Sequence, residues 1–167
     1  MVLFPKLISH DWRFEYKYRL TYQQYHRVRS AILPYMKKDQ YTLASPLKRY
    51  LVRSLYFDSH NLKNYEEKVN GDSDRVKLRI RSYSDTPTKG TRLRTALKAR
   101  KGIATEKHNS WIEYNSYQKF MSTWHWPDQT DVVLAEFERY IHLKTMRPKI
   151  IVEYLREGYS TRSRENI

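Results

Sequence analysis

The sequence predicts an α+β fold in which antiparallel strands form the sheet and helices pack outside it. Several segments alternate residue by residue between apolar and charged side chains, which is typical of half-buried strands. Short turns join some of these segments, and such connections favour antiparallel pairing. Segments with apolar residues at helical spacing lie between and after them.

The strands are expected where this alternation is clearest. They are expected at residues 12–19, 50–57, 75–83, 91–100, 103–112 and 149–157. In the first of them Trp12, Phe14, Tyr16 and Tyr18 share one face. Period two with aromatic side chains predicts a strand there.

The helices are expected over 21–33, over 62–69, and in two pieces over 115–143. Thr21 and Gln24 have the spacing of a capping box at the start of the first helix. Asp58 is expected to cap the second helix. Pro127 breaks the last segment, and Asp131 starts its second piece.

Length and composition narrow the class of protein. The 167 residues suit one domain, so we expect a leader over 1–10 and a single domain over 11–167. Lys and Arg number 32 against 18 Asp and Glu, and the net charge of +14 implies an anionic partner. The lack of cysteine excludes disulfides and thiol nucleophiles. A mean hydropathy of −0.87 predicts no transmembrane segment, and a cytoplasmic location is expected.

Basic residues gather on single faces of the expected strands. They are Arg75, Lys77, Arg79 and Arg81 in one strand, Arg92, Arg94, Lys98 and Arg100 in the next, and Arg13, Lys17 and Arg19 beside Glu15 in the first. A solvated outer face would normally mix charges of both signs, because like charges opposite each other destabilise a strand pair. The pattern therefore favours a face that binds a polyanion over a solvated face.

Other site chemistry is weakly supported. The four glycines fit neither a P-loop nor a dinucleotide-binding motif. The histidines show no HxxxH or HExxH spacing, so no zinc site is expected. Trp111, Trp124 and Trp126 are expected to pack helices on the sheet, with stacking at the surface as the alternative.

Six segments in order resemble the VTC domain, the polyphosphate polymerase domain of the vacuolar transporter chaperone family. They are RFEYKYRL (13–20), RSLYFDS (53–59), YEEKVNG (65–71), RVKLRIRSY (75–83), LKARKG (97–102) and PKIIVEYLREGY (148–159). The family belongs to the triphosphate tunnel metalloenzymes. The resemblance implies an antiparallel β tunnel with basic residues inside, helices outside, and a Mg²⁺ or Mn²⁺ ion that assists phosphoryl transfer from ATP to polyphosphate.

The resemblance also implies roles for individual residues. It implies catalytic roles for Lys17, Arg79, Arg81 and Lys98. It implies phosphate binding by Arg13, Arg19, Arg53, Arg75, Lys77, Arg94, Arg100, Lys107 and Arg156, with Thr105 as an alternative for the register of Lys107. It implies metal binding by Glu15 and Glu153, with a strand-borne salt bridge as the alternative for each.

The sequence departs from the family pattern in two ways that bear on catalysis. Relatives show LEIK where this chain reads Ala96-Leu97-Lys98, so an acid is missing. The chain also ends at Ile167, where relatives continue into closing strands, so an incomplete barrel is expected that a partner chain would complete.

Three functions are compatible with these features. The first is an enzyme that acts on ATP and polyphosphate or tripolyphosphate, as a polyphosphate polymerase or a triphosphatase. The second is a non-catalytic polyphosphate-binding module. The third, nucleic-acid binding, is disfavoured because the aromatic and basic side chains alternate onto opposite faces of the strands, whereas a single-strand binder needs both on one surface.

Overall fold

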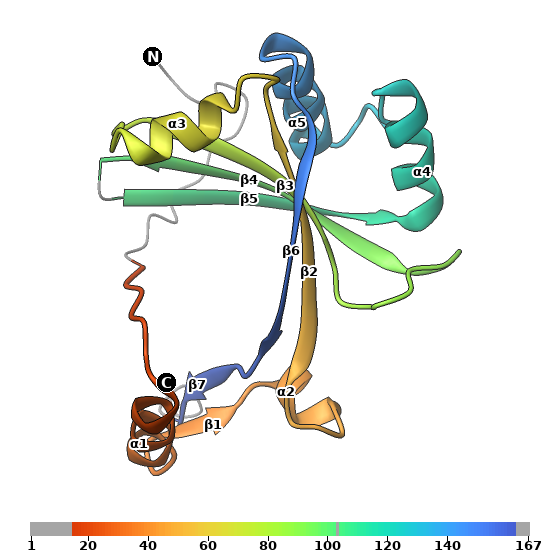
Figure 1. The fold of residues 1–167 in the computed structure, drawn as a ribbon. Helices are drawn as coiled ribbons and strands as arrows, with labels where there is room; N and C mark the ends of the chain where they lie inside the picture. The colour runs from red at the N-terminus through yellow and green to blue at the C-terminus, as the bar shows by residue number, and fades with distance from the viewer. Residues whose placement is uncertain (1–14, 103, 163–167) are drawn as a thin grey trace. The chain divides into compact units, whose positions relative to one another are not determined.

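The computed structural model describes residues 15–102 and 104–162, which form two compact units (Figure 1). Among the described residues, the first unit holds Glu15 and Val52–Glu153, and the second holds Tyr16–Leu51 and 154–162. The elements in chain order are α1 (Tyr22–Ile32), β1 (Met36–Lys38), α2 (Gln40–Ala44), β2 (Tyr50–Asp58), α3 (Lys63–Val69), β3 (Arg75–Ser82), β4 (Arg92–Lys101), β5 (Ala104–Glu113), α4 (Tyr114–Thr123), α5 (Val132–Leu143), β6 (Arg147–Arg156) and β7 (Tyr159–Thr161).

The first unit is built on a five-stranded sheet with the order β5-β4-β3-β2-β6. The pairs β2–β3, β3–β4 and β4–β5 are antiparallel, which confirms the expected α+β class. Within the part of the chain that the structure describes, the sheet is not closed into a barrel, because β5 and β6 form its two edges.

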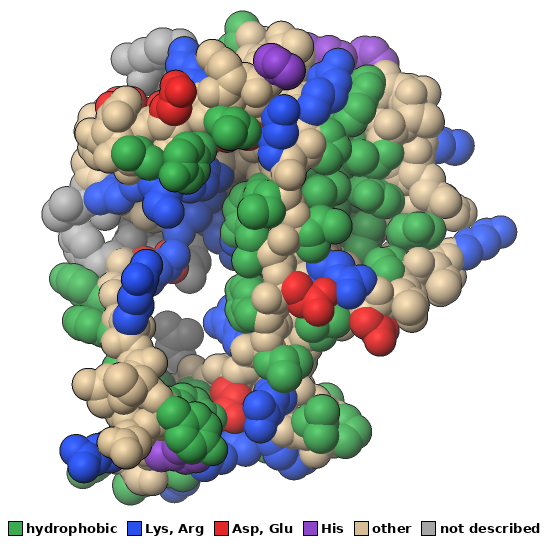
Figure 2. Space-filling view, viewed as in Figure 1, with side chains coloured by type: hydrophobic (Ala, Val, Ile, Leu, Met, Phe, Trp, Pro, Cys, Tyr) green, Lys and Arg blue, Asp and Glu red, His purple; other side chains and the backbone are tan. Residues whose placement is uncertain are grey.

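One face of this sheet is apolar and is covered by α4 and α5. Val76, Leu78 and Leu97 are at most 1% exposed and belong to one core cluster with Phe120 of α4 and Phe137 of α5. Their alternation with polar neighbours is the period-two pattern of the sequence, so the pleat directs every second side chain into this core. Figure 2 shows hydrophobic side chains between β6 and α4, where a pocket is lined by Leu55, Ile80, Leu93, Tyr114, Tyr117 and Ile151, among others.

The second unit joins α1 and α2 to a two-stranded antiparallel sheet of β1 and β7. Asp39 caps α2 by accepting from the N–H of Thr42, and the N–H of Asp39 donates to Gly158 O at 2.9 Å. A Cβ at Gly158 would lie 1.8 Å from Asp39 Oδ2, so any other residue there would displace the carboxylate that caps α2.

A carboxylate ties the C-terminal segment of the second unit to its first helix. Glu157 accepts hydrogen bonds from the hydroxyls of Tyr25 and Tyr159 and pairs with Arg29 at 3.3 Å. Burial raises the pKa of Glu157, but these donors outweigh burial and lower the pKa below its ordinary value.

Several element boundaries confirm the expectations from the sequence. Thr21 and Gln24 form both bonds of the capping box of α1, and Asp131 caps α5 through the N–H groups of Val133 and Leu134. Asp58 accepts from the backbone of Asn64 in α3. These side chains satisfy N–H groups that a helix start leaves without partners.

Other elements differ from the expectations. Residues 15–19 of the expected first strand are not in a strand, and residues 12–14 lie outside the described residues. Alternation identifies a segment that suits a sheet, but a strand also needs an edge with which to pair. The elements β1, α2 and β7 were not expected from the sequence. No helix among the described residues is both long enough and apolar enough to cross a membrane.

Candidate anion-binding site

Nine basic residues share the face of the sheet opposite the apolar core, and we call this surface the cation face. They are Arg75, Lys77, Arg79 and Arg81 of β3, Arg92, Arg94, Lys98 and Arg100 of β4, and Lys107 of β5. Alternate residues of a strand point to the same side, so the buried core residues of β3 and β4 place these cations on the other side. Figure 2 shows Lys and Arg side chains gathered where Figure 1 draws β4 and β5 next to α3.

The strand register places like charges directly opposite one another. The opposed pairs are Arg75 with Arg100, Lys77 with Lys98, Arg81 with Arg94, and Lys98 with Lys107. Three lysines therefore form a row across β3, β4 and β5, and β3 and β4 carry no acidic residue on this face. Like charges in directly opposed positions destabilise a strand pair, so this arrangement carries an electrostatic cost.

The arginines at the centre of the cation face are held by β2. Arg81 is 7% exposed and donates from Nε to Ser54 Oγ at 3.0 Å. Arg79 donates to the hydroxyl of Tyr56 at 3.2 Å. Ser54 and Tyr56 lie opposite Arg81 and Arg79 in the register of β2 and β3, so the strand pairing itself positions both guanidinium groups.

Two buried donors on this face lack a partner. The Nε atoms of Arg79 and Arg94 are buried and have no hydrogen-bond partner among the described residues. A buried guanidinium donor without an acceptor is costly, and an anion bound at the face would supply acceptors.

Aromatic side chains lie among the cations, which corrects one interpretation of the sequence. Trp111 lies opposite Arg94, whose guanidinium carbon is 5.4 Å from the indole ring centre, and Tyr83 lies 6.3 Å from Trp111, ring centre to ring centre. The expectation that aromatic residues avoid this face is wrong for Trp111 and Tyr83. The expectation that Trp111 packs a helix on the sheet is also wrong. Trp126 does pack as expected, because it is 2% exposed and stacks on Phe120 at 3.9 Å.

The electrostatic field of the cation face acts on Tyr83. Burial raises the pKa of this phenol, but hydrogen bonds and charge from Arg81 and Arg94 outweigh burial and lower the pKa below its ordinary value. The face therefore stabilises negative charge on one of its own side chains, as it would on a bound anion.

Lys98 pairs with a carboxylate from the N-terminal segment. Its Nζ lies 2.6 Å from Oε2 of Glu15, and both side chains are partly exposed. Lys107, expected as the lysine of the next strand, lies opposite Lys98, and Thr105 lies opposite Arg100. Both residues of the open alternative thus lie on the cation face, with the lysine in the lysine row.

Arg53 and Glu153, which were expected to bind phosphate and metal, lie elsewhere on the sheet. Arg53 lies in register with Ser82, on the side of the apolar core, and pairs with Glu153 at 2.5 Å. The structure thus places Glu153 beside Arg53 and Glu15 beside Lys98, and the two carboxylates do not converge. Phosphate binding by Arg53 and metal binding by Glu153 remain predictions, and the observed pairing favours the salt-bridge alternative for Glu153.

Four further residues that were expected in the site are not among those that form the cation face. Lys17, Arg19 and Arg156 are exposed and belong to the second unit, and Arg13 lies outside the described residues. Their roles remain predictions.

Sequence reasoning missed the neutral side chains that hold or border the cations. They are Ser54, Tyr56, Tyr83, Asn109 and Trp111. Counting by two from Lys107 reaches Asn109 and Trp111, so strand alternation was the signal that would have found these two.

Comparisons with known proteins agree with this architecture. No curated protein matches the chain. A candidate adenylate cyclase from Bacillus halodurans has a similar crystal structure, with a TM-score of 0.55 and 13% sequence identity. The match covers 92% of this chain and 66% of the other, so this chain spans just under two thirds of that protein. At this identity the similarity concerns the fold.

The family comparison covers nearly the whole sequence. The family model of the VTC domain matches residues 12–167, which include the sheet and its cation face. The chain therefore belongs to the VTC domain family.

Proposed function

We propose that the cation face binds a chain of phosphate groups, such as tripolyphosphate, inorganic polyphosphate or the triphosphate of ATP. The observation that carries this proposal is the register, which sets Arg81 against Arg94 and aligns three lysines across neighbouring strands. A bound polyanion offsets the repulsion that this register creates. Since neighbouring strands lie about 4.8 Å apart, the row offers cations at intervals that suit a linear ligand.

The donor chemistry of the face suits phosphate in particular. Guanidinium groups bind phosphate oxygens through paired, charge-assisted hydrogen bonds, and lysines add point charges. The partnerless Nε atoms of Arg79 and Arg94 are suitable donors for such oxygens. Trp111 and Tyr83 would border the ligand and shield these contacts from water.

The reaction class that follows from the family is phosphoryl transfer, as a polyphosphate polymerase or a triphosphatase. In this chemistry Mg²⁺ or Mn²⁺ neutralises charge on the phosphates, and such ions are held by one or two carboxylates together with phosphate oxygens. Glu15 is the carboxylate that fits this role, because it already lies beside Lys98. Within the site, the arginines of β3 would hold the phosphates and Lys98 would stabilise developing charge.

Ala96 supports a second candidate function, binding without turnover. It lies opposite Arg79 on the cation face, where the family has an acid, and it supplies no metal ligand. Affinity sums over many phosphate contacts, whereas transfer depends on one geometry in which an error of about 1 Å costs on the order of a hundredfold in rate. We therefore expect this chain to bind polyphosphate with turnover severely impaired.

We also propose that further β structure pairs with the edge strand β6. Among the described residues β6 pairs with β2 alone, and its Ile150 and Ile151 are 58% and 60% exposed. An exposed apolar edge is a template for another strand. A partner chain that supplies this strand would complete the wall of the site. Adding such a partner should raise the amount of phosphate polymer formed from ATP and Mn²⁺.

The test of binding compares two polyanions. Thermal unfolding is followed with tripolyphosphate and with single-stranded DNA at equal phosphate concentration and matched ionic strength. We expect tripolyphosphate to give the larger rise in melting temperature, because a ligand that binds only the folded state stabilises it according to its affinity. A larger rise with DNA would favour a nucleic-acid surface, for which Trp111 and Tyr83 offer stacking platforms.

The test of turnover uses ATP and Mn²⁺. The chain is incubated with both, and acid-labile phosphate polymer is sought on a gel while free phosphate is assayed in parallel. Little polymer together with tight tripolyphosphate binding supports the binding module. Robust polymer or phosphate release supports the enzyme and contradicts the expected impairment.

A further inference from the structure

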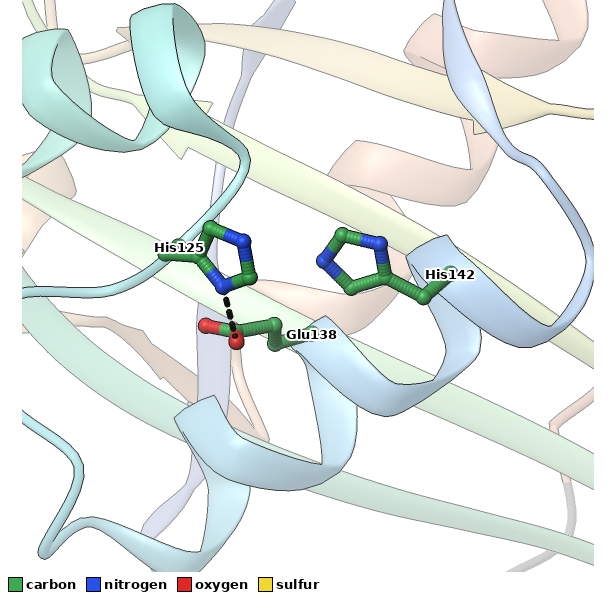
Figure 3. A group of neighbouring side chains, drawn as sticks. All are labelled: His125, Glu138 and His142. Atoms are coloured by element: carbon green, nitrogen blue, oxygen red, sulfur yellow. Dashed lines mark hydrogen bonds and ion pairs between the residues drawn. The ribbon is translucent and has the colours of Figure 1, made fainter.

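Two histidines and a glutamate meet where the connection after α4 lies beside α5. Suitable ligand atoms of His125, Glu138 and His142 all lie within 4.8 Å of one another (Figure 3). The imidazole rings of His125 and His142 stack with centres 4.9 Å apart, and Nδ1 of His125 lies 2.8 Å from Oε1 of Glu138. None of these residues is on the cation face.

Two structural elements bring the three side chains together. Glu138 and His142 are four residues apart on α5, a spacing that places both on one side of the helix. His125 comes from the connection after α4. It lies too far from His142 in the sequence for the two histidines to form a short zinc-binding motif. The fold thus assembles a group that the sequence alone gave no reason to expect.

The connection that carries His125 is anchored on both sides of this residue. Trp126 is buried and stacks on Phe120, and Trp124 has the guanidinium carbon of Arg147 at 4.4 Å from its ring centre. Trp124 adopts the left-handed conformation, with φ of 62°, and turns the chain at the end of α4. The backbone at His125 is therefore held by packing as well as by bonds to Thr123.

The carboxylate of Glu138 is positioned before any ion binds. Its Oε2 accepts from the N–H of Trp126 at 2.7 Å and from Nε2 of Gln129 at 3.4 Å. Burial raises the pKa of Glu138, but these bonds and that from His125 outweigh burial and lower the pKa below its ordinary value. Hydrogen bonds of this kind orient the ligands of metal sites and keep carboxylates ionised.

We propose that His125, Glu138 and His142 form a binding site for a transition-metal ion of the Zn²⁺ class. Two imidazoles and a carboxylate are one of the donor sets that Zn²⁺ takes in sites with three protein ligands, leaving one position for water. Bonds of about 2.0–2.2 Å bring ligand atoms to roughly 3.4 Å from one another, so the side chains need to close by about an ångström. Hard cations such as Mg²⁺ prefer oxygen ligands and would bind poorly here.

Two hydrogen bonds within the protein compete with an ion, the one between His125 and Glu138 and one at His142. Nε2 of His142 lies 3.0 Å from the carbonyl oxygen of Trp124, which requires the ring to carry a proton on that nitrogen. An ion at Nε2 replaces this hydrogen bond, and the ring proton moves to Nδ1. The ion would tie the connection after α4 to the last turns of α5, and it would stabilise the first unit.

The proposal is tested by titrating the full chain with ZnCl₂ in phosphate-free buffer after removal of metals with EDTA. Calorimetry and thermal unfolding report affinity and stabilisation, and MgCl₂ serves as the hard-cation comparison. We expect one Zn²⁺ per chain, a rise in melting temperature, and no comparable effect of Mg²⁺. The variants His125→Ala and His142→Ala should each weaken Zn²⁺ binding by roughly tenfold or more, since even outer-shell changes cost that much.

A matched control removes an exposed histidine elsewhere in the same unit. His60 is exposed and lies between β2 and α3, so His60→Ala should leave the Zn²⁺ affinity unchanged. The variant Glu138→Gln keeps the size of the side chain and tests the carboxylate without a cavity. Equal Zn²⁺ affinity in the control, in His125→Ala and in His142→Ala would overturn the proposal.

Discussion

On one side of β3 and β4, Leu78 and Leu97 are fully buried among the helices, and on the other side Lys77 and Lys98 face each other across the same two strands. The apolar side buries surface and contributes stability. The basic side carries like charges in opposed positions and contributes a cost that a ligand can offset. The pleat therefore places the stabilising contacts on one side of each strand and the proposed binding site on the other.

The largest expected effect is on the apolar side. Phe137→Ala removes a fully buried ring whose centre lies 5.5 Å from that of Phe57 and 5.9 Å from that of Phe120. We expect the free energy of unfolding to fall by about 3–5 kcal/mol, because the lost contacts leave a cavity. Urea unfolding followed by circular dichroism measures it. A loss below about 1 kcal/mol would show that α5 contributes little to this core.

The next effect is on the basic side and appears in binding. Arg79→Ala combined with Arg81→Ala should weaken tripolyphosphate binding by about a hundredfold or more, since each charge-assisted bond contributes roughly 1.5–3 kcal/mol. Calorimetric titration measures the affinity. The unliganded double variant should stay folded, because relief of repulsion offsets the loss of the bonds to Ser54 and Tyr56.

A charge-matched control separates site contacts from net charge. Lys119→Ala combined with Lys149→Ala removes two positive charges from exposed positions outside the cation face. Its tripolyphosphate affinity should stay within about twofold of the parent in moderate salt, where distant charges are screened. If both double variants lose affinity equally, general attraction explains binding and the cation face is not a specific site.

The contrast between the two sides also explains what the sequence could predict. Alternation in β3 and β4 predicted both faces, because strong apolar and basic patterns reinforce each other there. The caps at Thr21 and Asp131 were predictable because they depend on neighbouring residues. The strands β1 and β7 were not, since each has three residues and pairs across more than a hundred positions of the chain. Trp111 was misplaced although alternation from Lys107 along β5 puts it on the cation face, opposite Arg94.

A smaller effect is expected where a carboxylate competes with the ligand for a cation. Glu15→Gln removes the partner of Lys98, so tripolyphosphate affinity without metal should rise about two- to fivefold, in line with the modest strength of exposed ion pairs. The same titration with Mn²⁺ present should show the opposite change if Glu15 also binds the ion. Unchanged affinity under both conditions would remove Glu15 from the site.

The smallest effect is expected from the ion pair on the apolar side of the sheet. Arg53→Ala breaks the pair with Glu153, whose side chains are 34% and 45% exposed, and the bond to the carbonyl oxygen of Asp85. Exposed pairs contribute about 0–1 kcal/mol, so the free energy of unfolding should change by no more than that.

The binding result of this variant decides how far the site extends. Arg53 shares its side of the sheet with Leu55 and Ile80, and a ligand lying along Arg79 and Lys98 would be separated from it by the strand backbone. Tripolyphosphate affinity should therefore stay within about twofold of the parent, because Arg53 would make no direct contact with the ligand and salt screens its exposed charge. A tenfold loss would make Arg53 a phosphate ligand, as the resemblance to the family implies. Phosphate binding would then involve both faces of the sheet, and the separation into an apolar side and a basic side would not hold at β2.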